Sequence, residues 1–237
     1  MENISRGVVA SRTATNTAFV SWRLLGHEAA DTGFNIYRSR NGAAAVKLNA
    51  SPIVQTTDYR DTSAGFPQSV SYHVRSVSGG TEGPTSPSFT LPGDAPTRQF
   101  IPVPMQKPAP GVTPTGGNYD YLINDISVGD LNGDGEYEFI VRWDPSNAKD
   151  NSQSGYTGNV YLDAYTLAGT RIWRIDLGRN IRAGAHYTQF IVYDLDGDGI
   201  AEISCKTAPG TIDGAGNSVL LAGHNVNADY RNSGGYI

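Results

Sequence analysis

The sequence of 237 residues has few charged side chains and a single cysteine. Charged residues make up 17% of the chain, below the roughly 25% that is typical of soluble domains. Its 28 glycines and 13 prolines favour turns and short strands over long charged helices. Cys205 has no second cysteine to form an intramolecular disulfide, and its place in an apolar run is typical of a buried side chain. We therefore expect an all-β fold without disulfides.

Long apolar runs and a basic surface are also missing. No stretch approaches the ~18 apolar residues of a membrane span, so we expect none. The start Met-Glu-Asn-Ile-Ser-Arg lacks the basic and apolar opening of a signal peptide, which indicates a cytoplasmic protein or one whose export signal has been removed. Residues 1–91 hold eight Lys or Arg and six Asp or Glu, whereas residues 92–237 hold ten and seventeen. This acidity argues against nucleic acid as a partner, because phosphate contacts need a basic face.

Residues 1–91 are predicted to form a run of short strands. Apolar and polar side chains alternate in several segments, most of them bounded by Gly, Asn or Asp. These segments are Val8–Ala10, Ala18–Leu24, Phe34–Arg38 and Ser71–Val77. Such a pattern is typical of a small antiparallel sandwich with one face of each sheet buried. Trp22, Tyr37 and Tyr72 resemble the fibronectin type III pattern, so we expect a fibronectin type III-like β-sandwich over residues 1–91.

A proline-rich connector is predicted over residues 92–118, which hold seven of the thirteen prolines. Proline at this density blocks helices and central strands and favours an extended chain. We therefore place the boundary between two domains here.

An internal repeat dominates the second domain, residues 119–237. Residues 126–143 and 190–207 align without a gap, and in each copy an acidic, glycine-rich loop joins two apolar strands. Between the copies, Val160–Tyr165 and Arg171–Ile175 predict a further hairpin. Four strands per repeat are typical of propeller blades. Because two blades cannot close a ring, we expect an incomplete β-propeller, either in a fragment or in an open arrangement.

The two acidic loops are predicted calcium sites. Side-chain oxygens stand at alternate positions before a turn glycine, and a backbone carbonyl and a closing Glu follow, which suits the six to eight oxygen ligands of Ca²⁺. The predicted ligands are Asp130, Asn132, Asp134, Glu136 and Glu138 in the first loop, and Asp194, Asp196, Asp198, Ile200 and Glu202 in the second. The closing Glu stands at the ninth position, which excludes an EF-hand. A solvated acidic turn is the alternative, and the repetition argues against it. We expect the two sites to be structural rather than catalytic.

Three other features could contribute to a site. Asp125 either adds an oxygen to the first calcium site or caps a turn. The segment 179–189 combines two arginines with His186 and Tyr187, so it is either a surface for an anionic ligand or a polar loop. Asp144 follows Trp143 at the end of a predicted strand, where an aromatic beside a carboxylate favours sugar binding but also fits a plain turn.

Several longer strings carry a family resemblance over essentially the whole chain. They are Asn3–Ala10, Val20–Arg23, Phe34–Arg38, Trp143–Ser152 and Asp176–Phe190. Together they resemble the rhamnogalacturonan lyases of polysaccharide lyase family eleven. The resemblance implies a small β-sandwich, a large calcium-binding β-propeller, and secretion. It also implies cleavage of the rhamnose–galacturonate backbone of pectin by β-elimination.

The resemblance also assigns individual residues. It implies that both acidic loops and Asp125 bind Ca²⁺, and that Asn124 and Asp144 contact the sugar. Asn132 stands where many relatives have Asp, which removes one charge but keeps an oxygen. β-Elimination needs a cation that acidifies the proton beside the uronate carboxylate, and a base that removes this proton. We name His186 and Lys206 as candidate bases.

Length separates the functional hypotheses. The family's propeller continues past Ile237 and carries further catalytic residues, so this chain alone is short for an active enzyme. The main hypothesis is a monomeric rhamnogalacturonan lyase or its N-terminal part, with the pectin polymer as partner. The alternative is a non-catalytic, calcium-stabilised module for polysaccharide binding or adhesion. An integrin-like adhesion propeller would share the nine-residue loops but not the string from Arg182 to His186.

Overall fold

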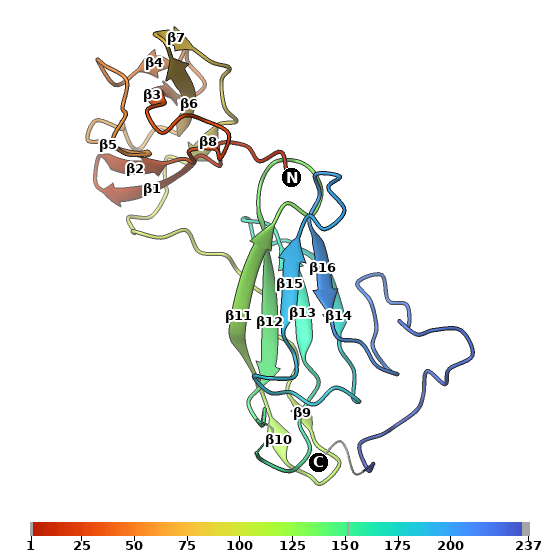
Figure 1. Ribbon diagram of the computed structural model, residues 1–237. Coiled ribbons are helices and arrows are strands. Elements are labelled where there is room, and N and C mark those ends of the chain that lie inside the picture. Colours follow the sequence, from red (N-terminus) through yellow and green to blue (C-terminus); the bar gives the residue numbers. More distant parts are fainter. Residues whose placement is uncertain (1, 151, 234–237) are drawn as a thin grey trace. The chain divides into compact units, whose positions relative to one another are not determined.

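The computed structural model describes residues 2–150 and 152–233, and these ranges contain strands and no helix (Figure 1). The all-β prediction is therefore confirmed. No helix that could cross a membrane occurs in these ranges. The chain folds as two compact units. The N-terminal unit comprises residues 3–102 and 134–136. Of the described residues, the C-terminal unit comprises residue 2 and the ranges 103–133, 137–150 and 152–233.

The N-terminal unit consists of two antiparallel sheets. One sheet has the order β1 (Val9–Ala14), β2 (Thr17–Ser21), β5 (Asp58–Asp61). The other has the order β4 (Val46–Lys47), β3 (Gly33–Arg40), β6 (Val70–Ser78), β7 (Thr81–Glu82), and β8 (Phe89–Leu91) also pairs with β6. The strands predicted from alternation correspond to β1, β2, β3 and β6, with shifted ends.

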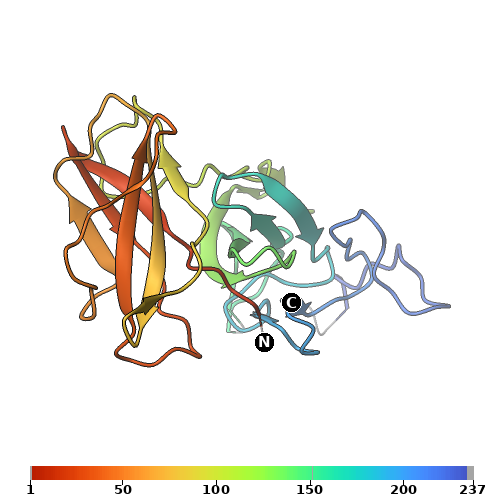
Figure 2. The same cartoon turned by 90° about the horizontal axis from the view of Figure 1, so that it is seen from above.

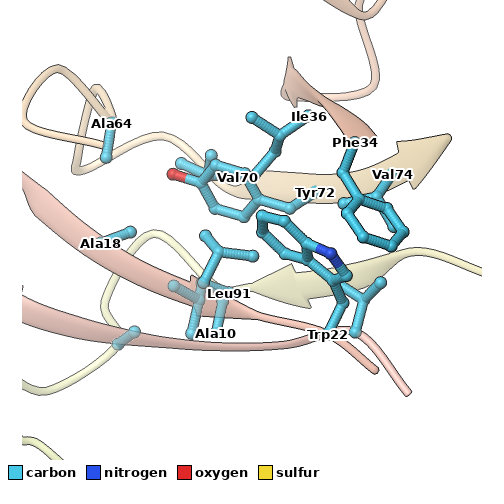
Figure 3. Packing of buried hydrophobic residues seen from close by; sticks show 13 residues of the cluster. Ala10, Ala18, Trp22, Phe34, Ile36, Ala64, Val70, Tyr72, Val74 and Leu91 are labelled. Carbon is cyan, nitrogen blue, oxygen red and sulfur yellow. The ribbon is translucent and has the colours of Figure 1, made fainter. Parts of the chain in front are cut away.

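The two sheets of the N-terminal unit can be followed in Figure 2, and they share one apolar core (Figure 3). Alternate residues of β2 and β6 point inward, so that Val20, Val70 and Val74 are fully buried. The Trp22 ring packs against Phe34 with 5.6 Å between the ring centroids. Inward alternation on both sheets is what allows a unit of this size to bury a common core.

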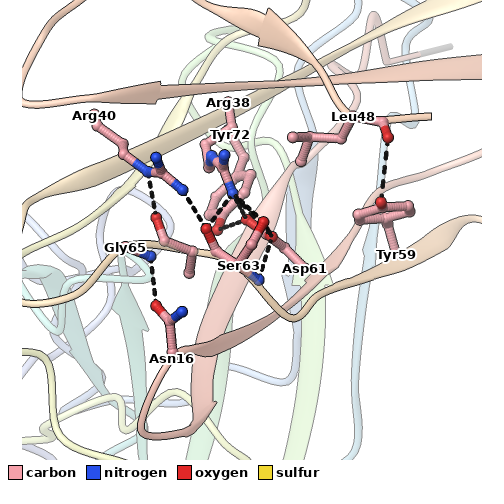
Figure 4. A network of polar contacts seen from close by, with 10 residues as sticks. Asn16, Arg38, Arg40, Leu48, Tyr59, Asp61, Ser63, Gly65 and Tyr72 are labelled. Carbon is pink, nitrogen blue, oxygen red and sulfur yellow. Dashed lines mark hydrogen bonds and ion pairs between the residues drawn. The ribbon is translucent and has the colours of Figure 1, made fainter. Parts of the chain in front are cut away.

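A buried polar network also joins the two sheets of this unit (Figure 4). Arg38 on β3 contacts both carboxylate oxygens of Asp61 on β5, at 2.9 and 2.8 Å. Tyr72 on β6 donates its hydroxyl hydrogen to the same carboxylate at 2.8 Å. The charges of Arg38 and Asp61 are therefore buried as a hydrogen-bonded pair, which offsets part of the cost of their desolvation.

The C-terminal unit is built on an antiparallel meander of four strands. These are β11 (Tyr121–Gly129), β12 (Glu138–Pro145), β13 (Tyr161–Tyr165) and β14 (Arg171–Asp176), in sequence order. A separate hairpin contains β15 (Phe190–Tyr193) and β16 (Glu202–Cys205). The hairpins predicted around both acidic loops and between β13 and β14 are all present.

The two faces of the four-stranded sheet contribute to different cores. On one face, Tyr121, Val141, Trp143 and Tyr165 form a buried cluster. On the other face, Leu162 belongs to a cluster against which Phe190 of β15 and side chains of β16 pack. Strand alternation therefore buries both faces, and the β15–β16 hairpin covers the second one.

The proline-rich segment is not a free connector over its whole length. Its residues from Val103 onward belong to the C-terminal unit. Met105 packs against the core cluster of Tyr121, and the backbone N–H of Gln106 donates to the hydroxyl of Tyr165 at 3.0 Å. The short strands β9 (Gly111–Val112) and β10 (Asn118–Tyr119) pair with each other. Proline prevents a central strand here, but it does not prevent the extended chain from covering a sheet face.

Candidate functional site

The two acidic loops have the same internal hydrogen bonds. The N–H of Gly133 donates to Asp130 Oδ1 at 2.7 Å, and the N–H of Gly197 donates to Asp194 Oδ1 at 2.8 Å. At the closing position, Leu131 N donates to Glu138 Oε2, and the equivalent atoms of the second loop do the same, each at 2.8 Å. The repeat in the sequence is therefore a repeat in conformation.

Paired glycines make this loop conformation possible. Gly133 and Gly135 have φ values of 77° and 84°, and Gly197 and Gly199 have φ values of 83° and 96°. Residues with a Cβ are strained at these angles, so glycine permits the tight turn that brings the acidic side chains together.

The second loop brings three carboxylates together. Oxygens of Asp194, Asp196 and Glu202 lie within 4.8 Å of one another. Asp194 is buried, and its two oxygens accept the N–H groups of Gly197 and Gly199 at 2.8 and 3.2 Å. Asp198 is outside this triad, and its Oδ1 accepts the N–H of Ile200 at 2.8 Å. The triad can hold a metal ion through carboxylate oxygens, which are the ligands that hard cations prefer.

The first loop buries its terminal carboxylates more deeply. Asp130 is 1% exposed and Glu138 is 2% exposed. Between them, the Asn132 amide donates to Glu138 Oε1 at 3.3 Å. Asp134 accepts the N–H of Glu136 at 2.8 Å, the contact that Asp198 makes in the second loop. The two loops also touch, because Ala201 N donates to the backbone carbonyl of Asp130 at 2.7 Å.

Asp125 lies away from the first loop. It is in the middle of β11, with its side chain 3.9 Å from Arg142 and its own carboxylate accepting the N–H of Ile126. Extended chain rises about 3.3 Å per residue, so the five residues to Asp130 place the two Cα atoms about 16 Å apart. This separation corrects both sequence-based expectations for Asp125, because it neither joins the ligands of that loop nor caps a turn.

Asn124 and Asp144 are brought together by a buried arginine between them. The Arg142 Nη2 group donates to Asn124 Oδ1, and Arg142 Nε lies 3.1 Å from Asp144 Oδ1. The second contact is an ion pair without hydrogen-bond geometry. Arg142 Nη1 also donates to the backbone carbonyl of Thr188 at 3.1 Å. One guanidinium therefore links β11, β12 and the segment before β15.

Local strand geometry explains this meeting. Arg142 and Asp144 are two residues apart on β12 and so point to the same face. The register of β11 shifts between Ile123 and Asp125, which makes Asn124 the extra residue of a β-bulge. A bulge re-aims a side chain locally, and here the Asn124 oxygen reaches the guanidinium while the residue stays exposed.

Burial controls the charge of Asp144, which is 7% exposed. Desolvation raises the pKa of its carboxyl group, the nearby Arg142 charge opposes this rise, and the net pKa is raised. The Arg142 charge therefore favours the ionised form of a carboxyl group that burial alone would drive further toward the neutral acid.

The two candidate bases lie around Tyr187. His186 is exposed, and its Nδ1 is 2.6 Å from Asp150 Oδ1. The Lys206 ammonium lies 6.0 Å from the centroid of the Tyr187 ring. Arg182, Tyr187 and Lys206 line a cavity of about 220 Å³. The Arg182 side chain is largely used to bind backbone carbonyls, including that of Gly155 at 3.2 Å.

Sequence reasoning missed the role of Arg142. It is the one charged residue within the apolar segment Phe139–Trp143 of β12. A charge at an inward-facing strand position needs a buried partner, and this signal could have identified it. Its partner Thr188 gives no signal, because the backbone carbonyl makes the contact.

Comparisons with known proteins follow the two units. Residues 100–237 match the family model described as "Rhamnogalacturonan lyase family 11, C-terminal domain". The chain belongs to rhamnogalacturonan lyase family 11. Residues 1–91 match the "Rhamnogalacturonan I lyases beta-sheet domain".

Two curated relatives cover the whole chain. It is 54% identical over 239 residues to rhamnogalacturonan endolyase YesW of Bacillus subtilis strain 168, and 48% identical over 237 residues to rhamnogalacturonan exolyase YesX of the same strain. The matches cover 100% of this chain but 36% of each relative. The chain thus spans about a third of the length of these family members.

Solved structures agree with the sequence matches. The crystal structure of YesW superposes with a TM-score of 0.83 at 53% identity, over 98% of this chain and 37% of that one. The Bacillus licheniformis rhamnogalacturonan lyase gives a TM-score of 0.83 at 54% identity over the same shares. The described fold is therefore similar to the matching part of solved lyases.

Proposed function

We propose that this chain is part of a rhamnogalacturonan lyase that cleaves the rhamnose–galacturonate backbone of pectin by β-elimination. The single observation that carries the proposal is the match over the whole chain to two relatives named as rhamnogalacturonan lyases. Because one relative is named an endolyase and the other an exolyase, the match supports the substrate and the reaction but not the mode of attack. The polymer is too large to cross a membrane unaided, so we place the protein outside the cell. We also propose that the protein is a monomer.

The finer architecture of the proposal is a fibronectin type III-like sandwich followed by propeller blades. The first, second and fifth strands of the N-terminal unit share a sheet, and the third and sixth share the other, which fits sandwich connectivity. The meander β11–β14 has the four antiparallel strands of a propeller blade, and β15–β16 would begin the next blade. The boundaries are residues 1–91, 92–118 and 119–237, with the correction that residues 103–118 pack on the blade.

The acidic loops are proposed to bind Ca²⁺. Oxygen ligands within 4.8 Å of one another in the second loop, and the shared hydrogen bonds of the first, support one ion in each loop. In this proposal the predicted loop ligands keep their roles, and only Asp125 is removed from the first site. Bound Ca²⁺ would neutralise the clustered carboxylates and so stabilise the turn between two strands.

The proposed sugar contacts are Asn124 and Asp144. The exposed amide of Asn124 can donate to a sugar hydroxyl while its oxygen stays on Arg142. In β-elimination a base removes the proton from the carbon beside the galacturonate carboxylate, and the electron pair of that C–H bond forms a double bond to the next ring carbon. The bond from that carbon to the leaving sugar oxygen breaks, and the oxygen takes up a proton, which leaves an unsaturated uronate. His186 and Lys206 remain the proposed bases of this chain, and His186 is accessible while its other ring nitrogen is available to accept a proton.

The proposal is tested with the 237-residue chain and with a chain extended to the length of its relatives. We expect both to bind rhamnogalacturonan oligosaccharides in calorimetry. Because the 237 residues span 36% of each relative, we expect the ultraviolet absorbance of unsaturated uronate to rise with the extended chain when the polymer and Ca²⁺ are supplied. Binding without product from the extended chain would favour the alternative of a non-catalytic polysaccharide-binding module. If neither chain binds the oligosaccharides and neither forms product, both functions are contradicted.

Calcium is tested separately by thermal unfolding with and without a chelator. We expect Ca²⁺ at 100 times its dissociation constant to stabilise the C-terminal unit by about 2.7 kcal/mol for each occupied loop. Asp196→Asn should reduce this effect, because it removes one carboxylate of the triad. Asp213→Asn is the matched control, since Asp213 lies outside the loops and caps a turn by accepting the N–H of Asn217 at 2.7 Å. An unchanged response of the Asp196 variant would contradict the proposed site.

A further inference from the structure

We infer that Arg142 is a positioning residue for the proposed sugar site, holding Asn124 and Asp144 in one fixed arrangement. The inference rests on the proposed function, because it concerns the two residues to which that function assigns sugar contacts. Its structural part, that one guanidinium orients both side chains, can be tested without any sugar.

The first step of the argument is that Arg142 is committed to this cluster. It is 4% exposed, and its guanidinium contacts Asn124, Asp144 and the Thr188 carbonyl, with Asp125 3.9 Å away. A buried arginine is costly unless it is paired, and these acceptors offset that cost.

The second step concerns Asn124, whose backbone does not fix its side chain. It is the extra residue of the β11 bulge and lacks a directly opposed partner on β12. An exposed asparagine amide at such a position would rotate between several rotamers. The charge-assisted bond from Arg142 Nη2 to Oδ1 selects one of these and leaves the amide hydrogens free to face a ligand.

The third step concerns the shape of the guanidinium. Its nitrogens form a planar fork that donates hydrogen bonds to Asn124 on one side and to the Thr188 carbonyl on another, while Nε forms an ion pair with Asp144. A lysine ammonium is a point charge and cannot reach the two acceptors in fixed directions while it stays beside the Asp144 carboxylate. Arg142→Lys should therefore keep the buried charge and lose the orientation, which separates positioning from charge.

The sugar-free experiment is nuclear magnetic resonance of the folded chain. The Asn124 side-chain amide and the Asp144 carboxyl carbon are assigned by loss of their signals in Asn124→Asp and Asp144→Asn. We expect Arg142→Met to shift both signals. Arg142→Lys should shift the Asn124 signal, and the melting temperature of this variant should stay closer to that of the wild type than the melting temperature of Arg142→Met does. Arg171→Met, on β14 of the same unit, is the control and should leave both signals in place. Unchanged Asn124 and Asp144 signals in a folded Arg142 variant would overturn the inference.

Sugar binding then tells positioning apart from a general structural role. We expect Arg142→Met to weaken oligosaccharide binding by about tenfold or more, the value of a lost charge-assisted hydrogen bond. In an Asn124→Ala/Asp144→Asn background the same change should weaken binding further by less than about twofold, because its targets are gone. Equal effects in both backgrounds would overturn the inference. If the wild type binds no oligosaccharide while substitution of Arg142 still shifts the Asn124 and Asp144 signals, the proposed function fails and the positioning role stands.

Discussion

Replacement of Asp163 should destabilise the C-terminal unit more than any surface carboxylate of that unit. Asp163 on β13 is 0% exposed and accepts hydrogen bonds from three side chains. Trp143 Nε1 donates at 3.0 Å, the Tyr165 hydroxyl at 2.6 Å, and the Arg174 Nε and Nη2 groups at 2.6 Å each. The carboxylate thus connects β12, β13 and β14 at the centre of the sheet.

The magnitude follows from what is left behind. In Asp163→Ala the Arg174 charge, whose side chain is 23% exposed, loses its carboxylate, and two buried neutral donors lose their acceptor. Breaking a buried ion pair from one side costs about 3–5 kcal/mol, and we expect a loss of this size in the free energy of unfolding. Asp163→Asn keeps the volume and one acceptor oxygen, so we expect a smaller loss of about 2–3 kcal/mol.

The assay is urea unfolding followed by tryptophan fluorescence. Two of the three tryptophans, Trp143 and Trp173, report on the C-terminal unit, whereas Trp22 belongs to the N-terminal unit. Asp61→Asn, which breaks the buried pair of the N-terminal unit, is the control and should affect the other transition. A loss below about 1 kcal/mol for Asp163→Ala, with a native-like spectrum, would refute the reasoning that the carboxylate holds the three strands together.

Three further predictions address pH, backbone and thiol chemistry. Burial raises the pKa of Asp61, but hydrogen bonds, led by that of Arg38, outweigh burial, and the net pKa is lowered. The ionised Asp61 therefore stabilises the fold above about pH 3.9, and this stabilisation is lost as the pH falls through the folded-state pKa. The urea midpoint should thus fall less on acidification in Asp61→Asn than in the wild type, and an equal fall in both would contradict this prediction. Gly178→Ala should cost more than Gly216→Ala in urea unfolding, because both have positive φ but only at Gly178 would a Cβ lie 2.4 Å from a backbone carbonyl oxygen; equal costs would disprove the clash. Burial raises the pKa of the Cys205 thiol, so alkylation by iodoacetamide at pH 8 should be slower in the native chain than in urea, and similar rates would exclude this protection.

The fold was predictable where its signals are local. Alternation located β3 and β6, and the repeat located the hairpins around both acidic loops, because each signal lies within one continuous segment. The path of the proline-rich segment was not predictable. Met105 packs on a sheet whose strands begin at Tyr121, and nothing in the segment itself indicates that contact.

The candidate site divides in the same way. The positions of the proposed loop ligands follow from spacing, since glycines and carboxylates within nine residues determine the turn. The cluster of Asn124, Arg142 and Asp144 depends on pairing between strands, and a one-residue change of register would turn Arg142 to the opposite face. The β11 bulge at Asn124 changes the register by one residue, and no residue of β11 predicts this bulge. Asp125 was misplaced for a related reason, because closeness in sequence is not closeness in space along an extended strand.

The acidity of the C-terminal part is explained by where its carboxylates lie and by the side chains that they contact. Eight of its carboxylates lie in the two loops, where a bound cation would offset their charge. Several carboxylates outside the loops contact a basic side chain of the same unit. These pairs are Asp120 with Lys107, Asp144 with Arg142, Asp150 with His186, Asp163 with Arg174, and Asp229 with Arg231. A net negative charge in the sequence therefore does not by itself mark a surface for a cationic macromolecule. It reflects two clusters of loop carboxylates beside carboxylates that are paired with basic side chains of the same unit.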